Sequence, residues 1–367
     1  MNTEKDPNTI KVNEALKNYQ IAKEFKEKGN YKEAEYFFKV ALNGIQNIYG
    51  ENKIEVASIY CSLGSTFFKQ NKFKEAELIY KKSLEICNRF SKNGYSVKAT
   101  VMCDLASLYH SQGLLDKAEK YYMDSLDILR NVNDFESIEV ATIYNNIASL
   151  YYEKGRYEEA ENLYMVTIEI YKKKFGEDSY QAATIISNLA SLYEKLNDLD
   201  KAEKLYKSVL NKLRNKFGKK HPYVVIVMSN LATVYDKKNK FNEAEILLKE
   251  VIDIYKGLYG DENHNIATIY NNLAVVYCNK GNLEESENLH KKALKIRVKL
   301  YGENHPESAI SYNNIADLYK KIGKTEEAEC LYLGAYKVFQ DMYGNDHPET
   351  TKIYNNLMNV NNKKDNI

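Results

Sequence analysis

Residues 269–294 read IYNNLAVVYCNKGNLEESENLHKKAL, and nearly the same phrase, SYNNIADLYKKIGKTEEAECLYLGAY, stands 42 residues later at 311–336. The same spacing runs through the chain and is marked by the small residue in the middle of the EAE motif. That residue stands at Ala34, Ala76, Ala118, Ala160, Ala202, Ala244, Ser286 and Ala328. An internal repeat this regular predicts an array of stacked structural units rather than a catalytic domain.

Each repeat is predicted to form two helices. In the first half of the quoted copy, apolar residues recur at spacings of three and four, which places them on one helical face. Gly281 and Asn282 follow, and both residue types tolerate the left-handed conformation that ends a helix. The second half carries acidic residues in its first turns, where the helix dipole favours them. Small residues such as Ala274 and Ser286 are expected where the two helices come closest.

The wider pattern of the repeat, NNLA..Y...G...EAE.LY..AL.I....YG..HP, extends over about residues 12–346. It resembles the tetratricopeptide repeat, specifically the 42-residue variety of the kinesin light chains. The resemblance implies an all-α fold, a tetratricopeptide-type α-solenoid in which helix-turn-helix repeats form a right-handed superhelix. It predicts a disordered segment at 1–11, eight repeats with a terminal capping helix within 12–360, and a disordered tail at 361–367.

Two features depart from the pattern. The second and third repeats lack the closing aromatic–glycine pair seen at Tyr301-Gly302, so their connections, at 89–96 and 131–138, are expected to run differently. In addition, no heptad-rich segment precedes the first repeat, whereas kinesin light chains hold the motor heavy chain through a coiled coil. The resemblance therefore covers the cargo-reading half and leaves motor association open.

Composition and motifs exclude several classes of function. The formal net charge is +1, which gives no general attraction to nucleic acid, and no apolar run is long enough for membrane insertion. The start has no signal-peptide character, and the five cysteines form no CxxC pair, so we expect a cytoplasmic protein. No phosphate-binding glycine loop, HExxH motif or serine elbow occurs. We therefore expect neither an enzyme nor a cofactor, and no catalytic residue.

Three His-Pro pairs begin at His221, His305 and His347. Because they occupy one repeat position, neighbouring histidines should lie a helix pair apart, too far to share a metal. Proline at such a place suits the first turn of the next helix. We expect these histidines to be structural, and no metal site.

The candidate binding residues form three rows on the first helix of each repeat. The residue types and their spacing of three and four place them on one face, distinct from the packing face. The rows are Asn146, Asn188, Asn230, Asn272 and Asn314; Thr142, Thr184 and Thr268; and Ser149 and Ser191. In the repeat family, first helices line the concave groove, and in kinesin-light-chain-like modules asparagine at this place contacts cargo peptides. The resemblance carries that role to this asparagine row.

An asparagine amide can pair with both groups of a peptide backbone. We therefore predict a scaffold that binds other proteins through extended peptide segments in this groove. The same asparagines could instead form hydrogen bonds between neighbouring helices. A regulatory or co-chaperone module is the alternative function, although the lysine expected for a carboxylate clamp is replaced, for example, by Ser187 and Asn271. The basic stretch at 211–221 is either a solvated loop or a dock for an acidic partner.

Overall fold

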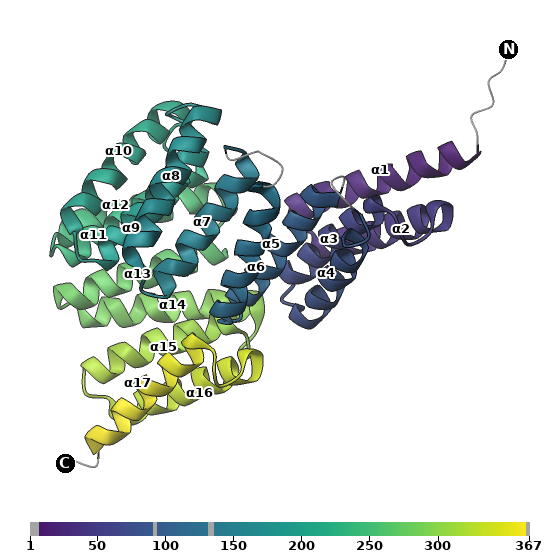
Figure 1. The fold of residues 1–367 in the computed structure, drawn as a ribbon. Helices are drawn as coiled ribbons and strands as arrows, with labels where there is room; N and C mark the ends of the chain where they lie inside the picture. The colour runs from purple at the N-terminus through teal and green to yellow at the C-terminus, as the bar shows by residue number, and fades with distance from the viewer. Residues whose placement is uncertain (1–6, 91–93, 131–135, 365–367) are drawn as a thin grey trace. The chain divides into compact units, whose positions relative to one another are not determined.

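The structure, a computed structural model, describes residues 7–90, 94–130 and 136–364, and every regular element within them is an α-helix (Figure 1). The elements in chain order are α1 (Pro7–Glu27), α2 (Tyr31–Tyr49), α3 (Ile54–Lys69), α4 (Phe73–Cys87), α5 (Tyr95–Ser111), α6 (Leu115–Arg130), α7 (Ile138–Glu153), α8 (Tyr157–Phe175), α9 (Tyr180–Lys195), α10 (Leu199–Phe217), α11 (Pro222–Lys237), α12 (Phe241–Tyr259), α13 (His264–Lys280), α14 (Leu283–Tyr301), α15 (Pro306–Lys321), α16 (Thr325–Tyr343) and α17 (Pro348–Lys364).

The helices alternate between the two halves of the repeat. Odd-numbered helices up to α15 are first helices and even-numbered ones are second helices, while α17 is a further helix after the eighth repeat. Consecutive first helices also contact each other; for example, α3 contacts α5 and α11 contacts α13. This order confirms the prediction of an all-α solenoid of the tetratricopeptide type.

The ends of the helical part differ from the predicted boundaries of 12–360. Helix α1 already includes residues 7–11, and α17 continues to residue 364, because no glycine or proline interrupts 8–27 or 349–364. The remaining parts of the predicted disordered ends, 1–6 and 365–367, lie outside the described residues.

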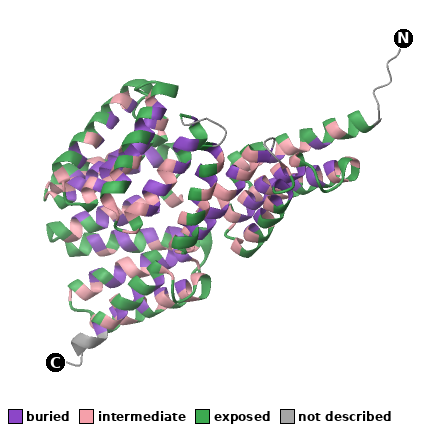
Figure 2. Ribbon diagram, viewed as in Figure 1, coloured by how far each residue is buried: buried purple, intermediate pink, exposed green. Residues whose placement is uncertain are grey.

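The chain divides into two compact units, Met1–Val166 (unit 1) and Thr167–Ile367 (unit 2), with the boundary inside α8. Each unit has a core of its own. Figure 2 shows buried residues alternating with exposed ones along the helices. In unit 1 the core runs from Ala15 to Leu150, and in unit 2 its largest part runs from Ala183 to Ile296.

Small residues sit where helices cross, as predicted. Ala34, Ala76 and Ala118 are fully buried. At Gly64, an added Cβ would lie 2.8 Å from the ring of Tyr80, which belongs to the second helix of the same repeat. The close approach of the two helices therefore depends on small side chains.

The last glutamate of the EAE motif joins consecutive repeats. Glu203 on α10 accepts hydrogen bonds from Lys238 (2.6 Å) and Lys240 (3.1 Å), which follow in the next repeat, and from Lys207 (2.6 Å). Burial raises the pKa of Glu203, but these three lysines outweigh it and lower the pKa to about 2. Glu203 is therefore an inter-repeat contact.

The second helix of the second repeat differs from its counterparts. Helix α4 has 15 residues, whereas α2 and α10 have 19. Residues 91–93 and 131–135 of the two connections lie outside the described part of the chain. In the second repeat the second helix ends early, at Cys87. The different course of the two connections stays a prediction.

Candidate functional site

The asparagine row lies on consecutive first helices. In unit 2, Asn188, Asn230, Asn272 and Asn314 come from α9, α11, α13 and α15, and each of these helices contacts the next. In unit 1, Asn146 lies on α7. All five side chains are half-buried. Within unit 2 the row therefore follows a series of touching helices, as the repeat spacing predicts.

Hydrogen bonds divide this row into two groups. The Asn146 amide nitrogen donates to Cys103 Sγ on the preceding first helix, at 3.6 Å, and Asn188 also has a partner. In contrast, the side chains of Asn230, Asn272 and Asn314 form no hydrogen bond within the residues that the structure describes. Three consecutive amides in unit 2 thus keep both donor and acceptor capacity.

The threonine row uses its hydroxyl protons locally. Thr142, Thr184 and Thr268 donate to the carbonyl four residues earlier, at 2.8, 3.0 and 3.3 Å. Such back-bonding leaves the hydroxyl oxygen able to accept a further hydrogen bond. Thr142 and Thr184 are exposed and could accept one from a ligand.

The serine row connects the two helices of one repeat. The Ser191 hydroxyl on α9 lies 2.7 Å from the Tyr206 hydroxyl on α10, and Ser107 lies 3.0 Å from Tyr122. Burial raises the pKa of Tyr164 on α8, and the neighbouring Ser149 hydroxyl acts in the other direction. These serines therefore have a structural contact, and a role in ligand binding stays a prediction.

In the seventh repeat, histidine takes the place of that tyrosine. His290 on α14 is buried, and its Nδ1 lies 2.9 Å from Asn271 Oδ1 on α13. Burial, together with the charge of Arg297, lowers the pKa of His290 to about 4. The histidine is therefore neutral near pH 7.

Sequence reasoning missed Arg297, which is 3% exposed. Its guanidinium donates to Ser311 (3.0 Å) and Thr268 (3.1 Å), and its Nε lies 3.5 Å from the carboxylate of Glu307. Other repeats have an apolar residue at this position, as with Leu129. A comparison of repeats position by position would have singled out this arginine.

Asp104 takes the asparagine place on α5 in unit 1. Cys61 Sγ on α3 donates to its carboxylate at 3.3 Å. Burial raises the pKa of Asp104 to about 6, although this hydrogen bond and the charges of Lys26 and Lys69 act in the other direction. Cys61 and Asp104, like Cys103 and Asn146, bond one first helix to the next within unit 1.

The His-Pro pairs cap helices. His221 Nδ1 accepts from the backbone nitrogen of Tyr223, and His305 Nδ1 accepts from that of Glu307. The proline after each lies in the first turn of the helix, which confirms the predicted structural place. Among the described residues, no group of three or more potential ligands could hold a metal ion.

The basic stretch at 211–221 is partly neutralised. Lys212 Nζ lies 3.0 Å from the carboxylate of Asp178, and Arg214 lies 3.3 Å from that of Glu250. Lys219 and Lys220 remain exposed. The stretch is therefore a weaker candidate for an acidic partner than its composition suggests.

None of the described helices is both long enough and apolar enough to cross a membrane. The family model described as tetratricopeptide repeat matches residues 13–89, 97–173, 139–215, 181–257 and 265–341. No curated protein sequence matches the chain.

Three solved structures are similar to this chain to different degrees. A Rap protein complexed with Competence and Sporulation Factor is 14% identical, over 97% of this chain and 98% of that chain, with a TM-score of 0.60. The apo form of the quorum sensor NprR from B. thuringiensis is 17% identical, over 96% and 98%, with a TM-score of 0.55. Kinesin light chain TPR-like repeats from Podosopora anserina are 22% identical, over 54% and 93%, with a TM-score of 0.45.

At these identities, the similarity to the first two structures shows a shared fold and not the ligand. The repeats and the fold indicate a protein–protein interaction scaffold, and a fold of this kind is typically non-catalytic.

Proposed function

The chain belongs to the tetratricopeptide repeat family, and we propose that it is a non-enzymatic cytoplasmic scaffold that holds extended peptide segments of other proteins. The segment lies along the first helices of unit 2. It is held by the amides of Asn230, Asn272 and Asn314, with Asn188, Thr184 and Thr268 of the same unit beside them. Such a protein needs no cofactor.

One observation carries this proposal: three consecutive amides of the asparagine row have no hydrogen-bond partner among the described residues while they are half-buried. A half-buried amide that is unpaired within the protein gains most from an outside partner. A peptide backbone offers both a donor and an acceptor to each amide.

The spacing of the helices suits such a ligand. Packed helices lie roughly 10 Å apart. An extended chain advances about 3.3 Å per residue, so every third residue of the ligand would meet the next asparagine. Since the contact is to the backbone, binding should depend little on ligand sequence along this row.

The test removes all three amides. Replacing Asn230, Asn272 and Asn314 together by Ala should weaken binding by roughly 1.5–4.5 kcal/mol, since each hydrogen bond contributes about 0.5–1.5 kcal/mol. This is about one to three powers of ten in Kd. The probe is a peptide selected from a randomised display library panned against the full chain, and binding is measured by titration.

A matched control replaces three exposed asparagines on second helices, Asn211, Asn215 and Asn288, by Ala. This control should bind the same peptide with unchanged affinity. A thermal melt accompanies each variant. If the first triple variant binds normally, the asparagine row is not the binding face; if it unfolds, the row is structural.

A second candidate function is regulatory. NprR, described as a quorum sensor, and the Rap protein, solved with Competence and Sporulation Factor, both share this fold. A cargo adaptor, as the resemblance to kinesin light chains suggests, would bring motor or vesicle proteins in an affinity pull-down. A co-chaperone would bring chaperones that are lost when their terminal carboxylate is deleted.

A further inference from the structure

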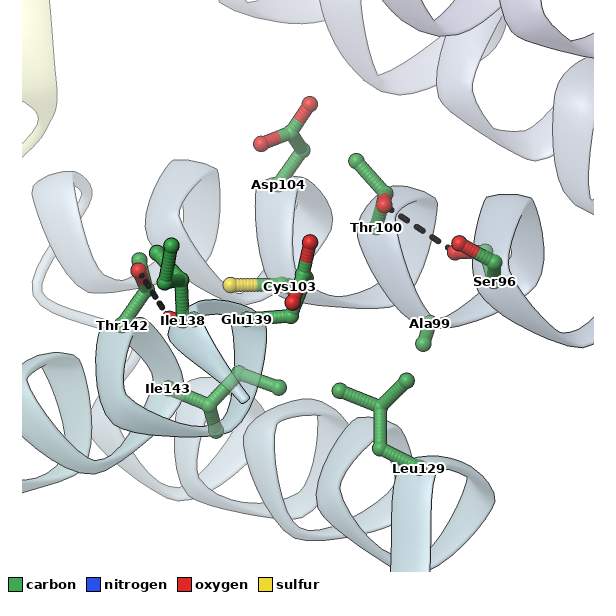
Figure 3. Close-up of a pocket in the computed structure, with 10 residues that line it drawn as sticks. All are labelled: Ser96, Ala99, Thr100, Cys103, Asp104, Leu129, Ile138, Glu139, Thr142 and Ile143. Carbon is green, nitrogen blue, oxygen red and sulfur yellow. Dashed lines mark hydrogen bonds between the residues drawn. The ribbon is translucent and has the colours of Figure 1, made fainter. Parts of the chain in front are cut away.

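Unit 1 has a hollow of ≈ 190 Å³ between α5, α6 and α7, which we call the α5–α7 hollow (Figure 3). Leu129 of α6 points into it from below, between Ala99 and Ile143. Thr100 of α5 and Glu139 of α7 are polar residues of its lining. The hollow thus combines apolar walls with hydroxyl and carboxylate groups from both first helices.

The same place in the seventh repeat is filled by the protein itself. A step of four repeats, 168 residues, leads from Leu129 to Arg297 and from Glu139 to Glu307. The same step leads from Thr100 to Thr268. In unit 2, Arg297 lies between the two first helices, 3.1 Å from Thr268 and 3.5 Å from the Glu307 carboxylate.

Unit 1 keeps the acid and the hydroxyl but lacks the cation. Leu129 is too short to reach the position of a guanidinium and has no charge. Glu139 forms no ion pair within the residues that the structure describes. Asp104, also in the lining, already accepts a hydrogen bond from Cys61, so Glu139 is the lining carboxylate without a hydrogen-bond partner among the described residues.

We propose that the α5–α7 hollow binds an arginine side chain of a partner protein, with the guanidinium on Glu139 and Thr100 and the aliphatic stem against Leu129. This inference rests on the proposed function, because the arginine belongs to a bound peptide segment. In unit 2 the corresponding threonine and glutamate, Thr268 and Glu307, do accept the guanidinium of Arg297. The third partner of Arg297, Ser311, corresponds to Ile143 in the hollow.

Size and chemistry both agree with this occupant. A cavity of about 150 Å³ accommodates benzene, so the hollow has room for a long side chain. The planar guanidinium matches a carboxylate with two parallel hydrogen bonds, and its stem is apolar. Lysine carries the same charge without that geometry and should bind less tightly.

The experiment uses full-length protein and peptides selected from a randomised display library. The variant Leu129→Phe should fill the hollow, as Phe339 does at the same position of the last repeat. Peptides that bind the wild type but not this variant should share an arginine. Glu139→Gln should weaken these peptides by about tenfold. Glu85→Gln, an exposed glutamate of α4 in the same unit, is the matched control and should change nothing.

Two further changes test the charge. Replacing the arginine of a selected peptide by citrulline, which keeps the shape and removes the charge, should weaken binding to the wild type about as much as Glu139→Gln does. Leu129→Arg should rebuild the Arg297 arrangement, keep the melting temperature and block these peptides. If Leu129→Arg does not fold, Leu129→Phe still decides.

The outcomes separate this inference from the proposed function. Some peptides could lose affinity for Leu129→Phe and yet contain no arginine, or bind Glu139→Gln as tightly as the wild type. Such peptides would show that the hollow is an apolar pocket and would overturn the assignment. Peptides that bind Leu129→Phe normally but not the triple asparagine variant would overturn the proposal for the hollow and leave the proposed function standing. A library without any binder would overturn both.

Discussion

A single residue type acquires different roles here through its neighbours. Glu203, in the last position of EAE, is 8% exposed and accepts hydrogen bonds from three lysines. Glu243, directly before the alanine of the next repeat's EAE, is exposed and has no such partners among the described residues. Three charge-assisted hydrogen bonds outweigh the desolvation of one carboxylate, and the low pKa of Glu203 follows from that.

Acid should therefore destabilise the fifth and sixth repeats through Glu203. Its pKa is about 2 when folded and about 4.3 when unfolded. The unfolded chain thus binds the proton more readily, and the stabilisation present above pH 4.3 is lost as pH falls toward 2. Glu203→Gln should reduce the fall in melting temperature between pH 5 and 2.5. Glu243→Gln should leave that fall unchanged, and an equal effect of both variants would contradict the role of Glu203.

At the scale of the element, a polar contact inside an apolar interface ties the first helix to the second in the third, fifth, seventh and eighth repeats. In the fifth repeat the contact is Ser191 with Tyr206. In the sixth, Leu248 replaces the tyrosine, and Thr233 donates instead to a carbonyl of its own helix. The interface accommodates either tyrosine or leucine because the Ser191 and Thr233 hydroxyls can each donate a hydrogen bond to a carbonyl of their own helix.

A double-mutant cycle measures this contact. Ser191→Ala and Tyr206→Phe each remove one partner, and we expect a coupling energy of about 0.5–1.5 kcal/mol from urea unfolding. Ser191 also lies 3.1 Å from the carbonyl of Ser187, so the single variants should cost little. The corresponding cycle of Thr233→Ala with Leu248→Ala should show only packing effects. A coupling near zero in the first cycle would mean that the hydroxyl contact adds nothing.

At the scale of the whole molecule, the repeat could be predicted from sequence because the 42-residue spacing is unbroken and each half has helical periodicity. The helix pairs and the small crossing residues follow from that pattern. The pairing of Glu203 with Lys238 and Lys240 could not, because it depends on how one repeat stacks on the next. For the same reason the sequence did not separate Asn146, which bonds to Cys103, from Asn272, which has no partner among the described residues.

The two units have separate cores, so damage in one should stay there. Ala232 on α11 is fully buried, and Ala232→Leu should overpack its helix pair at a cost of about 1–3 kcal/mol. In a solenoid each repeat contacts its neighbours only, so amide protection should fall most within 180–300. Hydrogen exchange with mass spectrometry measures this repeat by repeat. Ala106→Leu, at the same repeat position in unit 1, is the reciprocal control and should lower protection around α5 and α6. If either variant lowered protection equally in α1–α5 and in α9–α13, the stability of the chain would not be local, and the nearest-neighbour account would fail.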